Sequence, residues 1–281
     1  MNQYRFELVG LQVALQTPGE ISISPNLQPF LTEGCGDADC VIELHTSHTL
    51  PPISGGGVWH GPSCYHWAEG AMRIFHCHEP QGQPFAVAEI FTNGNIRIDV
   101  LPAYMDYFSG SAGIFNRIGM ETMLLQHHGL LLHASLIDYK GKAIAFTGPS
   151  GVGKSTQADL WRSCLGADVL NGDRAALRKG EIWTAYGSPY AGTSGIYKNQ
   201  SASLAAIIVL GQARENQLRQ LTATEAFAHM YPELSAHRWD KAFMERVADL
   251  CLQLLADVPV YRLDCRPEES AVRLVKKGLG L

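Results

Sequence analysis

The sequence predicts an α/β protein, with a small β-rich N-terminal domain over residues 1–125 and a second domain of strand–loop–helix units over residues 126–281. Three observations lead to this prediction. Most of the first part of the chain forms short apolar or alternating runs separated by turn residues, a pattern typical of β-strands. A glycine-rich loop at residues 148–155 follows an apolar strand and precedes a helical pattern. An apolar run at residues 204–211 is typical of a strand buried on both faces.

The N-terminal domain is expected to consist of strands joined by tight turns. Residues 4–15, YRFELVGLQVAL, fit either one half-buried strand or a pair of strands. In residues 84–100 the pair Asn93-Gly94 separates two apolar runs, and Asn-Gly supplies the positive φ angles of a tight hairpin turn. Residues 104–129 then become helical and lead into the second domain.

The second domain begins with two predicted strands, residues 130–139 and 143–148, joined by a tight turn. A helix is predicted from about Lys154 to Cys164, directly after the glycine-rich loop. The remaining predicted elements are strands at 167–170, 204–211 and 258–265, and helices at about 224–231, 238–255 and 267–279.

Composition and charge argue against several classes of partner. The net charge is −5, and the sequence contains no substantial cluster of Lys or Arg. Both observations disfavour nucleic acid or an anionic membrane surface as the main partner. No stretch approaches the roughly eighteen apolar residues of a membrane span, and Arg5 and Glu7 interrupt what would be the apolar part of a signal peptide. The seven cysteines are odd in number and scattered, so we expect reduced thiols and a cytoplasmic protein.

Histidines and cysteines crowd 44 residues of the N-terminal domain and are candidate zinc ligands. They are Cys35, Cys40, His45, His48, His60, Cys64, His66, His76, Cys77 and His78. Their spacing matches no zinc motif, and on a strand His76 and His78 would share one face while Cys77 faced the other. Scattered core and surface residues are therefore favoured over a structural metal site.

Residues 148–155, GPSGVGKS, match the phosphate-loop (Walker A) pattern G-x-x-x-x-G-K-[ST] at every fixed position, in the required context of a strand before and a helix after. In such a loop, backbone N–H groups and the helix N-terminus surround phosphate groups. Lys154 would reach the terminal phosphates of ATP, and the Ser155 hydroxyl would ligate Mg²⁺. The predicted nucleotide-binding residues are Gly148, Ser150, Gly151, Val152, Gly153, Lys154, Ser155 and Thr156.

A phosphate loop needs a further acidic group to hold Mg²⁺ or to accept a proton from an attacking hydroxyl. The apolar strand at 204–211 is followed by Gln212 and offers no carboxylate. Asp173, in the sequence LNGDR, lies 19 residues after Lys154, a gap that one short helix and one strand would fill. Asp173 is therefore the predicted base and metal ligand, with an aspartate that only caps a turn as the alternative.

The segment from His133 through the phosphate loop to Asp173-Arg174 resembles the nucleotide core of the HPr kinase/phosphorylase family. That family has a histidine on the strand before the loop and a DDR-type acidic motif shortly after it, and it shares its fold with the ATP-dependent phosphoenolpyruvate (PEP) carboxykinases. The resemblance implies an HPr kinase C-terminal/PEP carboxykinase-like P-loop core over residues 126–281. Short relatives with this layout include free-serine kinases and lasso-peptide kinases. Members of the family are often multimeric, so the resemblance is compatible with a homo-oligomer.

The resemblance implies an ATP- and Mg²⁺-dependent kinase that transfers the γ-phosphoryl group to a serine-type hydroxyl of a peptide or small molecule. Asp173 would act as general base, Lys154 would bind phosphates, and Ser155 and Asp173 would ligate the metal. His133 would orient Asp173 or touch a phosphate oxygen, unless it is a core histidine. Arg174 would either bind phosphate or brace Asp173.

The chain also departs from the family pattern. Gly172 stands where the family has the first acid of its pair, so one carboxylate is missing, and the family's later Glu and Arg have no clear counterpart. Residues 187–199 offer Ser194, Tyr197 and Lys198 instead, and suit a loop over phosphate or acceptor, or else a solvated connector. A regulatory ATPase or nucleotide-dependent binding module is the main alternative function, and carboxykinase chemistry is the second.

Overall fold

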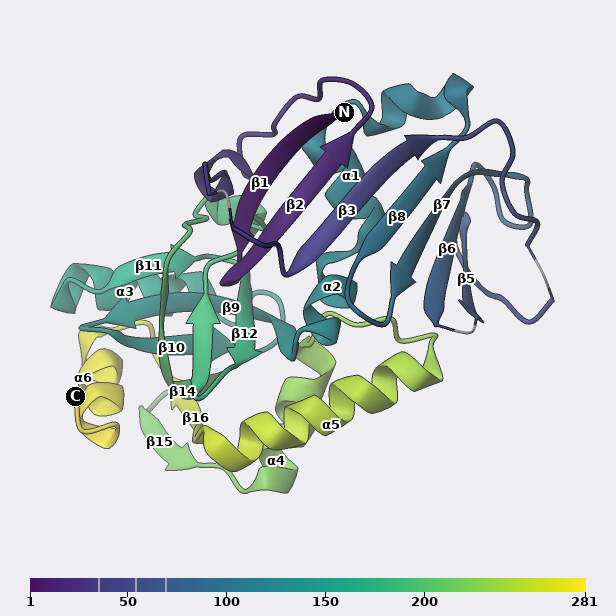
Figure 1. Ribbon diagram of the computed structural model, residues 1–281. Helices are drawn as coiled ribbons and strands as arrows, with labels where there is room; N and C mark the ends of the chain where they lie inside the picture. Colours follow the sequence, from purple (N-terminus) through teal and green to yellow (C-terminus); the bar gives the residue numbers. More distant parts are fainter. Residues whose placement is uncertain (35, 54, 69) are drawn as a thin grey trace. The chain divides into compact units, whose positions relative to one another are not determined.

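The computed structural model describes residues 1–34, 36–53, 55–68 and 70–281. It is a mixed α/β structure with two large sheets (Figure 1). The chain divides into two compact units: the first is Met1–His127 with His237–Lys241, and the second is His128–Ala236 with Ala242–Leu281. Within the described part of the chain, no helix combines the length and apolarity needed to cross a membrane.

The first unit is built on an eight-stranded sheet in the order β1-β2-β3-β8-β7-β6-β5-β4 (Figure 1). Strand β3 pairs in parallel with β2 and β8, and the other neighbours are antiparallel. The strands are β1 (Asn2–Leu8), β2 (Leu11–Thr17), β3 (Cys40–Thr46), β4 (Val58–His60), β5 (Ser63–Ala68), β6 (Ala71–Cys77), β7 (Pro84–Phe91) and β8 (Ile96–Val100). The β-rich character predicted for this region is confirmed.

Two turns of this sheet can be compared with the sequence predictions. The first predicted run is a pair of strands, β1 and β2, which reverse direction at Val9-Gly10 with positive φ at both residues. Asn93-Gly94 does join β7 to β8, as predicted, but only Gly94 has a positive φ, of 86°. The loop is closed by the Phe91 N–H, which donates to the Asn95 carbonyl at 2.9 Å. It is therefore longer than a two-residue turn.

The predicted helical stretch after β8 is divided into three pieces. They are the 3-10 helix η2 (Pro102–Phe108), α1 (Ser111–Ile118) and α2 (Met120–Gln126). Gly119 separates α1 from α2 and has a φ of 77°, which glycine adopts without strain. Helix α1 packs on the sheet, where Phe115 meets Phe6 of β1 edge to face at 5.4 Å.

The predicted scatter of histidines and cysteines can be examined at every position except Cys35, which lies outside the described residues. Among the described residues, no group of three or more His, Cys, Asp or Glu side chains could hold a metal ion. His76 is 7% exposed, and its Nδ1 lies 3.3 Å from the Ser63 hydroxyl. Cys64 packs in a small apolar cluster with Phe75.

His76 should make the first unit sensitive to acid. Burial, helped by Arg117, lowers the pKa of His76 from 6.5 to about 4. On acidification, His76 of the unfolded chain therefore binds a proton at a higher pH than His76 of the folded chain. The contribution of His76 to the free energy of unfolding is fully present above pH 6.5 and is lost as the pH falls through 4. Urea titrations at pH 7 and pH 4 should show that this residue accounts for about 3 kcal/mol of the lost free energy of unfolding. His76→Phe should lose that part of the pH dependence, and an unchanged dependence would contradict the prediction.

The second unit is built on a sheet in the order β10-β9-β12-β13-β14-β16-β15, with β11 beside β9. An additional parallel pairing of β10 with β14 closes five of these strands into a ring. The strands are β9 (Gly129–Tyr139), β10 (Lys142–Thr147), β11 (Asp168–Asn171), β12 (Arg174–Lys179), β13 (Trp183–Tyr186), β14 (Ser201–Gln212), β15 (Gln217–Gln220) and β16 (Val260–Cys265). The sequence patterns did not indicate β12, β13 and β15, which are short and carry several polar residues.

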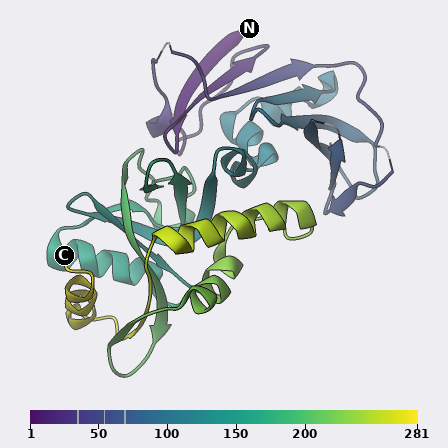
Figure 2. The same cartoon turned by 60° about the horizontal axis from the view of Figure 1, so that its bottom comes forward.

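Strand β14 of the second unit is buried on both faces, as predicted for its apolar run. Ala206, Ile208 and Leu210 join a core cluster with helices α3 and α6, which lie beside each other (Figure 2). Ile207 and Val209 alternate with them, point to the opposite face and are at most 1% exposed. The helices of this unit are α3 (Lys154–Leu165), α4 (Ala223–Met230), α5 (Lys241–Asp257) and α6 (Glu269–Gly278), close to the predicted ranges.

Candidate functional site

The glycine-rich loop connects the end of β10 to the start of α3, which begins at Lys154 as predicted. Gly151 and Gly153 have φ values of 79° and 113°, so the loop uses conformations that side chains rarely adopt. The Lys154 side chain is folded back on the loop, where its Nζ donates to the carbonyl oxygens of Gly148 at 2.8 Å and Pro149 at 3.2 Å. The loop backbone therefore surrounds the Lys154 ammonium, which is hydrogen-bonded to two of its carbonyl groups.

The Lys154 ammonium is a buried cation whose charge interacts with those of two nearby carboxylates. The residue is 8% exposed. Burial lowers the pKa of Lys154 below its usual value, and the negative charges of Glu233 and Asp173 act in the opposite direction. Because the hydrogen-bond partners of its Nζ are two neutral carbonyl oxygens, the ammonium can exchange them for the oxygens of a phosphate group that enters the loop.

Asp173 is positioned by an interruption in the pairing of β9. The second half of β9 pairs with β11 and its first half pairs with β12, and Asp173 lies between the two partner strands. The buried Asn171 side chain holds this turn, because its Oδ1 accepts from the N–H groups of Asp173 at 2.9 Å and Arg174 at 2.7 Å. Its Nδ2 donates to the carbonyls of Ser188 at 2.9 Å and Tyr190 at 3.0 Å. Asn171 therefore ties Asp173 to the following loop, a role that the sequence analysis missed.

His133 lies on β9 between two carboxylates. Its Nε2 is 3.6 Å from Asp173 Oδ1, and its Nδ1 is 2.9 Å from Glu233 Oε2. Because an ionised carboxylate can only accept a hydrogen bond, Nδ1 carries the proton and donates to Glu233. In the neutral ring, Nε2 then presents a lone pair toward Asp173. His133 is half-buried with charged neighbours and is not the apolar core histidine that was its alternative assignment.

Glu233 reaches this site from a segment 100 residues away from His133 in the chain. It ends the 3-10 helix η4 (Tyr231–Glu233), and its side chain is 14% exposed. The next residues fasten the segment to β9: Leu234 forms a β-bridge with Leu132, and the Ser235 N–H donates to the Leu131 carbonyl at 2.8 Å. No motif in the sequence around Glu233 marked it, because only the folded chain brings it beside His133.

Arg174 contacts the Asp173 carboxylate and holds it in position. The Arg174 Nε is 3.6 Å from Asp173 Oδ2, and its Nη1 donates to the Ser235 hydroxyl. The geometry therefore favours the bracing role among the two alternatives for this residue.

The predicted residues line one pocket of about 290 Å³ at the N-terminus of α3. Its walls are formed by His133, Ser150, Gly151, Gly153, Lys154, Ser155, Thr156, Gly172, Asp173 and Thr193. We call this cavity the phosphate pocket. Of the predicted site residues, Gly148, Val152 and Arg174 lie outside its walls.

The loop after β13 forms part of the same pocket. A Cβ atom at Gly172 would lie 1.9 Å from the Ser194 hydroxyl, so this position has no room for the acidic side chain of a paired-acid motif. A Cβ atom at Gly192 would meet the Asp173 carboxyl carbon at 2.8 Å. Thr193 lines the pocket. Lys198, the cation of this loop, does not line the pocket and forms an ion pair with Asp168. Residues 187–199 are therefore packed against Asp173 and are more than a solvated connector.

The pocket offers oxygen atoms that suit Mg²⁺. Ser155 and Asp173 both line it, and a hydroxyl with one carboxylate is a ligand set that Mg²⁺ takes together with phosphate oxygens and water. Ser155 and Asp173 would supply two ligands of such an ion, and phosphate oxygens and water would supply the others.

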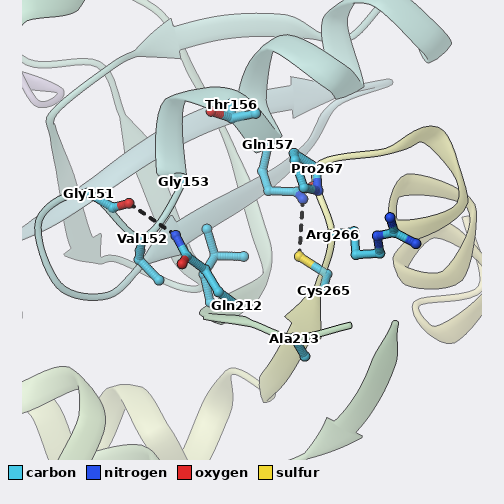
Figure 3. Close-up of a pocket in the computed structure, with 11 residues that line it drawn as sticks. Gly151, Val152, Gly153, Thr156, Gln157, Gln212, Ala213, Cys265, Arg266 and Pro267 are labelled. Carbon is cyan, nitrogen blue, oxygen red and sulfur yellow. Dashed lines mark hydrogen bonds between the residues drawn. The ribbon is translucent and has the colours of Figure 1, made fainter. Parts of the chain in front are cut away.

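A second cavity, of about 420 Å³, adjoins the loop on another side (Figure 3). We call it the nucleoside cavity, after the ligand that is proposed for it in the next section. The Gln212 amide at the end of β14 reaches across to the Gly151 carbonyl at 3.4 Å, and Gln157 donates to the Cys265 sulfur at 3.3 Å. Its walls are Gly151, Val152, Gly153, Thr156, Gln157, Leu210, Gln212, Ala213, Cys265, Arg266 and Pro267. It combines apolar surface with amide and guanidinium groups.

Comparison with solved structures finds a remote likeness, whereas comparison with family models and curated proteins finds none. No protein-family model matches the sequence, and no curated protein matches it. Among solved structures, the Hpr(Ser) kinase/phosphatase from Coxiella burnetii is similar to 54% of this chain and 99% of its own chain, with 10% sequence identity and a TM-score of 0.31. A likeness this weak carries no argument about the activity, which is inferred below from the chain's own residues.

Glu233 should be a positioning residue that acts through His133. Glu233→Gln keeps an acceptor for the Nδ1 proton but removes the charge. If the site transfers phosphoryl groups from ATP, as proposed in the next section, we expect kcat to fall about tenfold with little change in the KM for ATP. In a His133→Asn background the same substitution should have no further effect, which a double-mutant cycle measures. Glu215→Gln, on an exposed turn, is the control. Additive losses in the cycle would show that Glu233 acts independently.

Proposed function

We propose that this protein is a phosphotransferase of the kinase type, which moves the γ-phosphoryl group of ATP to an alcohol of the serine type. One observation carries the proposal: the Asp173 carboxylate and the phosphate-binding groups Lys154 and Ser155 line the same pocket. A carboxylate in that position can take a proton from a hydroxyl that attacks a phosphate held by the loop.

The three side chains beside the pocket form a path for that proton. Asp173 would accept the proton from the attacking hydroxyl as the new O–P bond forms. When its Nε2 carries no proton, His133 can take the proton onward, because Nε2 lies 3.6 Å from Asp173 Oδ1. The resulting imidazolium would then be held by Glu233, which already accepts the Nδ1 proton at 2.9 Å. After the second step the imidazolium lies between two carboxylates, those of Asp173 and Glu233.

The donor side is supported by the loop and the cavity beside it. Lys154 would exchange its contacts with two backbone carbonyls for contacts with phosphate oxygens, and its charge would offset the charge that develops on the leaving group. Mg²⁺ held by Ser155, Asp173 and the phosphates would supply further charge neutralisation. The nucleoside cavity shares Gly151, Gly153 and Thr156 with the phosphate pocket and is large enough for a base and ribose.

The proposal is tested by incubating the protein with γ-labelled ATP and Mg²⁺, with serine and serine-containing peptides as acceptors. Label on an acceptor is the expected result. Label that appears only as free phosphate with every acceptor would instead indicate a regulatory ATPase. Transfer from tripolyphosphate as efficient as transfer from ATP would show that the nucleoside cavity does not bind the donor.

A further inference from the structure

A third cavity opens from the phosphate pocket between α3 and the turn at residues 192–196. Its volume is about 450 Å³, and it shares Ser155, Gly172 and Thr193 with the phosphate pocket. The nucleoside cavity meets the phosphate pocket at a different set of residues, Gly151, Gly153 and Thr156. Two cavities therefore adjoin the phosphate pocket at different residues, and we call them its two outlets.

Phosphoryl transfer requires two outlets, because the attacking and leaving oxygens lie roughly in line on opposite sides of the phosphorus atom. The donor's leaving group and the acceptor hydroxyl must approach from different sides. If the nucleoside occupies the outlet beside Gly151, the outlet beside Gly172 and Thr193 is left for the acceptor. This outlet also adjoins Asp173, the residue that would receive the hydroxyl proton.

The third cavity changes character along α3. Its middle is apolar, with Ala158, Val169 and Ile196 on the walls. Its outer end carries an ion pair between Arg162 Nη2 and Asp159 Oδ1 at 2.8 Å, with both side chains more than half exposed. The guanidinium has further N–H donors beyond the one used by Asp159, and its planar fork suits a carboxylate.

Resting on the proposed function, we propose that this cavity is the acceptor site and that it binds an extended hydroxyl-bearing peptide whose carboxylate meets Arg162. The length decides between acceptor classes. Ser155 and Arg162 are seven residues apart on one helix, which corresponds to about 10 Å along its axis. In free serine the hydroxyl and carboxylate are separated by much less. In an extended peptide, two or three further residues at about 3.3 Å each cover this distance.

The test uses a series of acceptors, Ser followed by zero to four glycines, each with a free and with an amidated C-terminus. We expect kcat/KM to rise from free serine to a maximum at two or three glycines, and amidation to raise the KM about tenfold at that length. In Arg162→Gln the free-acid peptide should have the KM of the amide. Arg273→Gln removes a comparable exposed ion pair on α6 and should retain the preference for the free acid.

The outcomes separate this inference from the function on which it rests. Transfer to all acceptors without dependence on length or on the free carboxylate would overturn the acceptor site and leave the kinase intact. An Arg162→Gln protein that still prefers the free acid would also overturn it. ATP hydrolysis without transfer to any peptide, or no turnover of ATP at all, would overturn both proposals.

Discussion

Asp173→Asn is expected to lower the rate of phosphoryl transfer by about 10²–10⁴-fold while the protein still binds ATP. The substitution keeps the size of the side chain and removes the group that would accept the hydroxyl proton. Asn171 holds the turn through the backbone N–H groups of Asp173 and Arg174, so the local structure does not depend on the carboxylate. The loop and Lys154 remain in place to bind phosphate. Single-turnover transfer of labelled phosphate and equilibrium binding of a fluorescent ATP analogue measure the two effects separately.

Asp168→Asn is the matched control for this experiment. Asp168 begins β11, the strand that leads to Asp173, and its carboxylate pairs with Lys198 outside the phosphate pocket. It should transfer phosphate at the rate of the unmodified protein. If Asp173→Asn did the same, the assignment of the base would be wrong.

Lys154→Met is expected to weaken the binding of ATP and of tripolyphosphate by a similar factor, about 100-fold. The reason is that Lys154 is the buried cation of the phosphate pocket and would contact phosphate oxygens rather than the nucleoside. Equal losses for the two ligands, measured by isothermal titration calorimetry, would place the contact on the phosphates. A loss confined to ATP would contradict this assignment.

The same variant should fold at least as well as the unmodified protein. Burial lowers the pKa of Lys154 below the usual 10.5, so the charged form costs the folded protein stability at neutral pH, and this cost is relieved only as the pH rises toward 10.5. Removing the charge removes that cost and the associated pH dependence. Lys142→Met, at the exposed start of β10, is the control and should keep full affinity for both ligands.

Local sequence carried the prediction of the strand, loop and helix around Lys154. The apolar strand, the glycines and the helix pattern lie next to one another in the chain, so neighbouring residues determine their conformation. Helix α3 accordingly begins at the predicted residue and ends one residue beyond the predicted end. Strands β12, β13 and β15 gave no comparable signal, because their four to six residues are stabilised by pairing with strands that are distant in the sequence.

Two residues of the candidate site could also be predicted from the sequence. Asp173 was predicted from its spacing to the glycine-rich loop and His133 from the family resemblance, and the register of β9 with β12 sets them beside each other. The missing second carboxylate could not be found in this way. A side chain at Gly172 would collide with Ser194, and the carboxylate beside His133 comes instead from Glu233 at the end of a short 3-10 helix.

By itself, the sequence determined the glycine-rich loop, the helix that follows it and the position of the aspartate shortly downstream, because each depends on residues close together in the chain. Only the tertiary structure decided which groups surround that aspartate. The contacts of Glu233, Ser235 and Thr193 arise from segments that meet through β-pairing and packing across tens of residues, and no local pattern encodes such meetings.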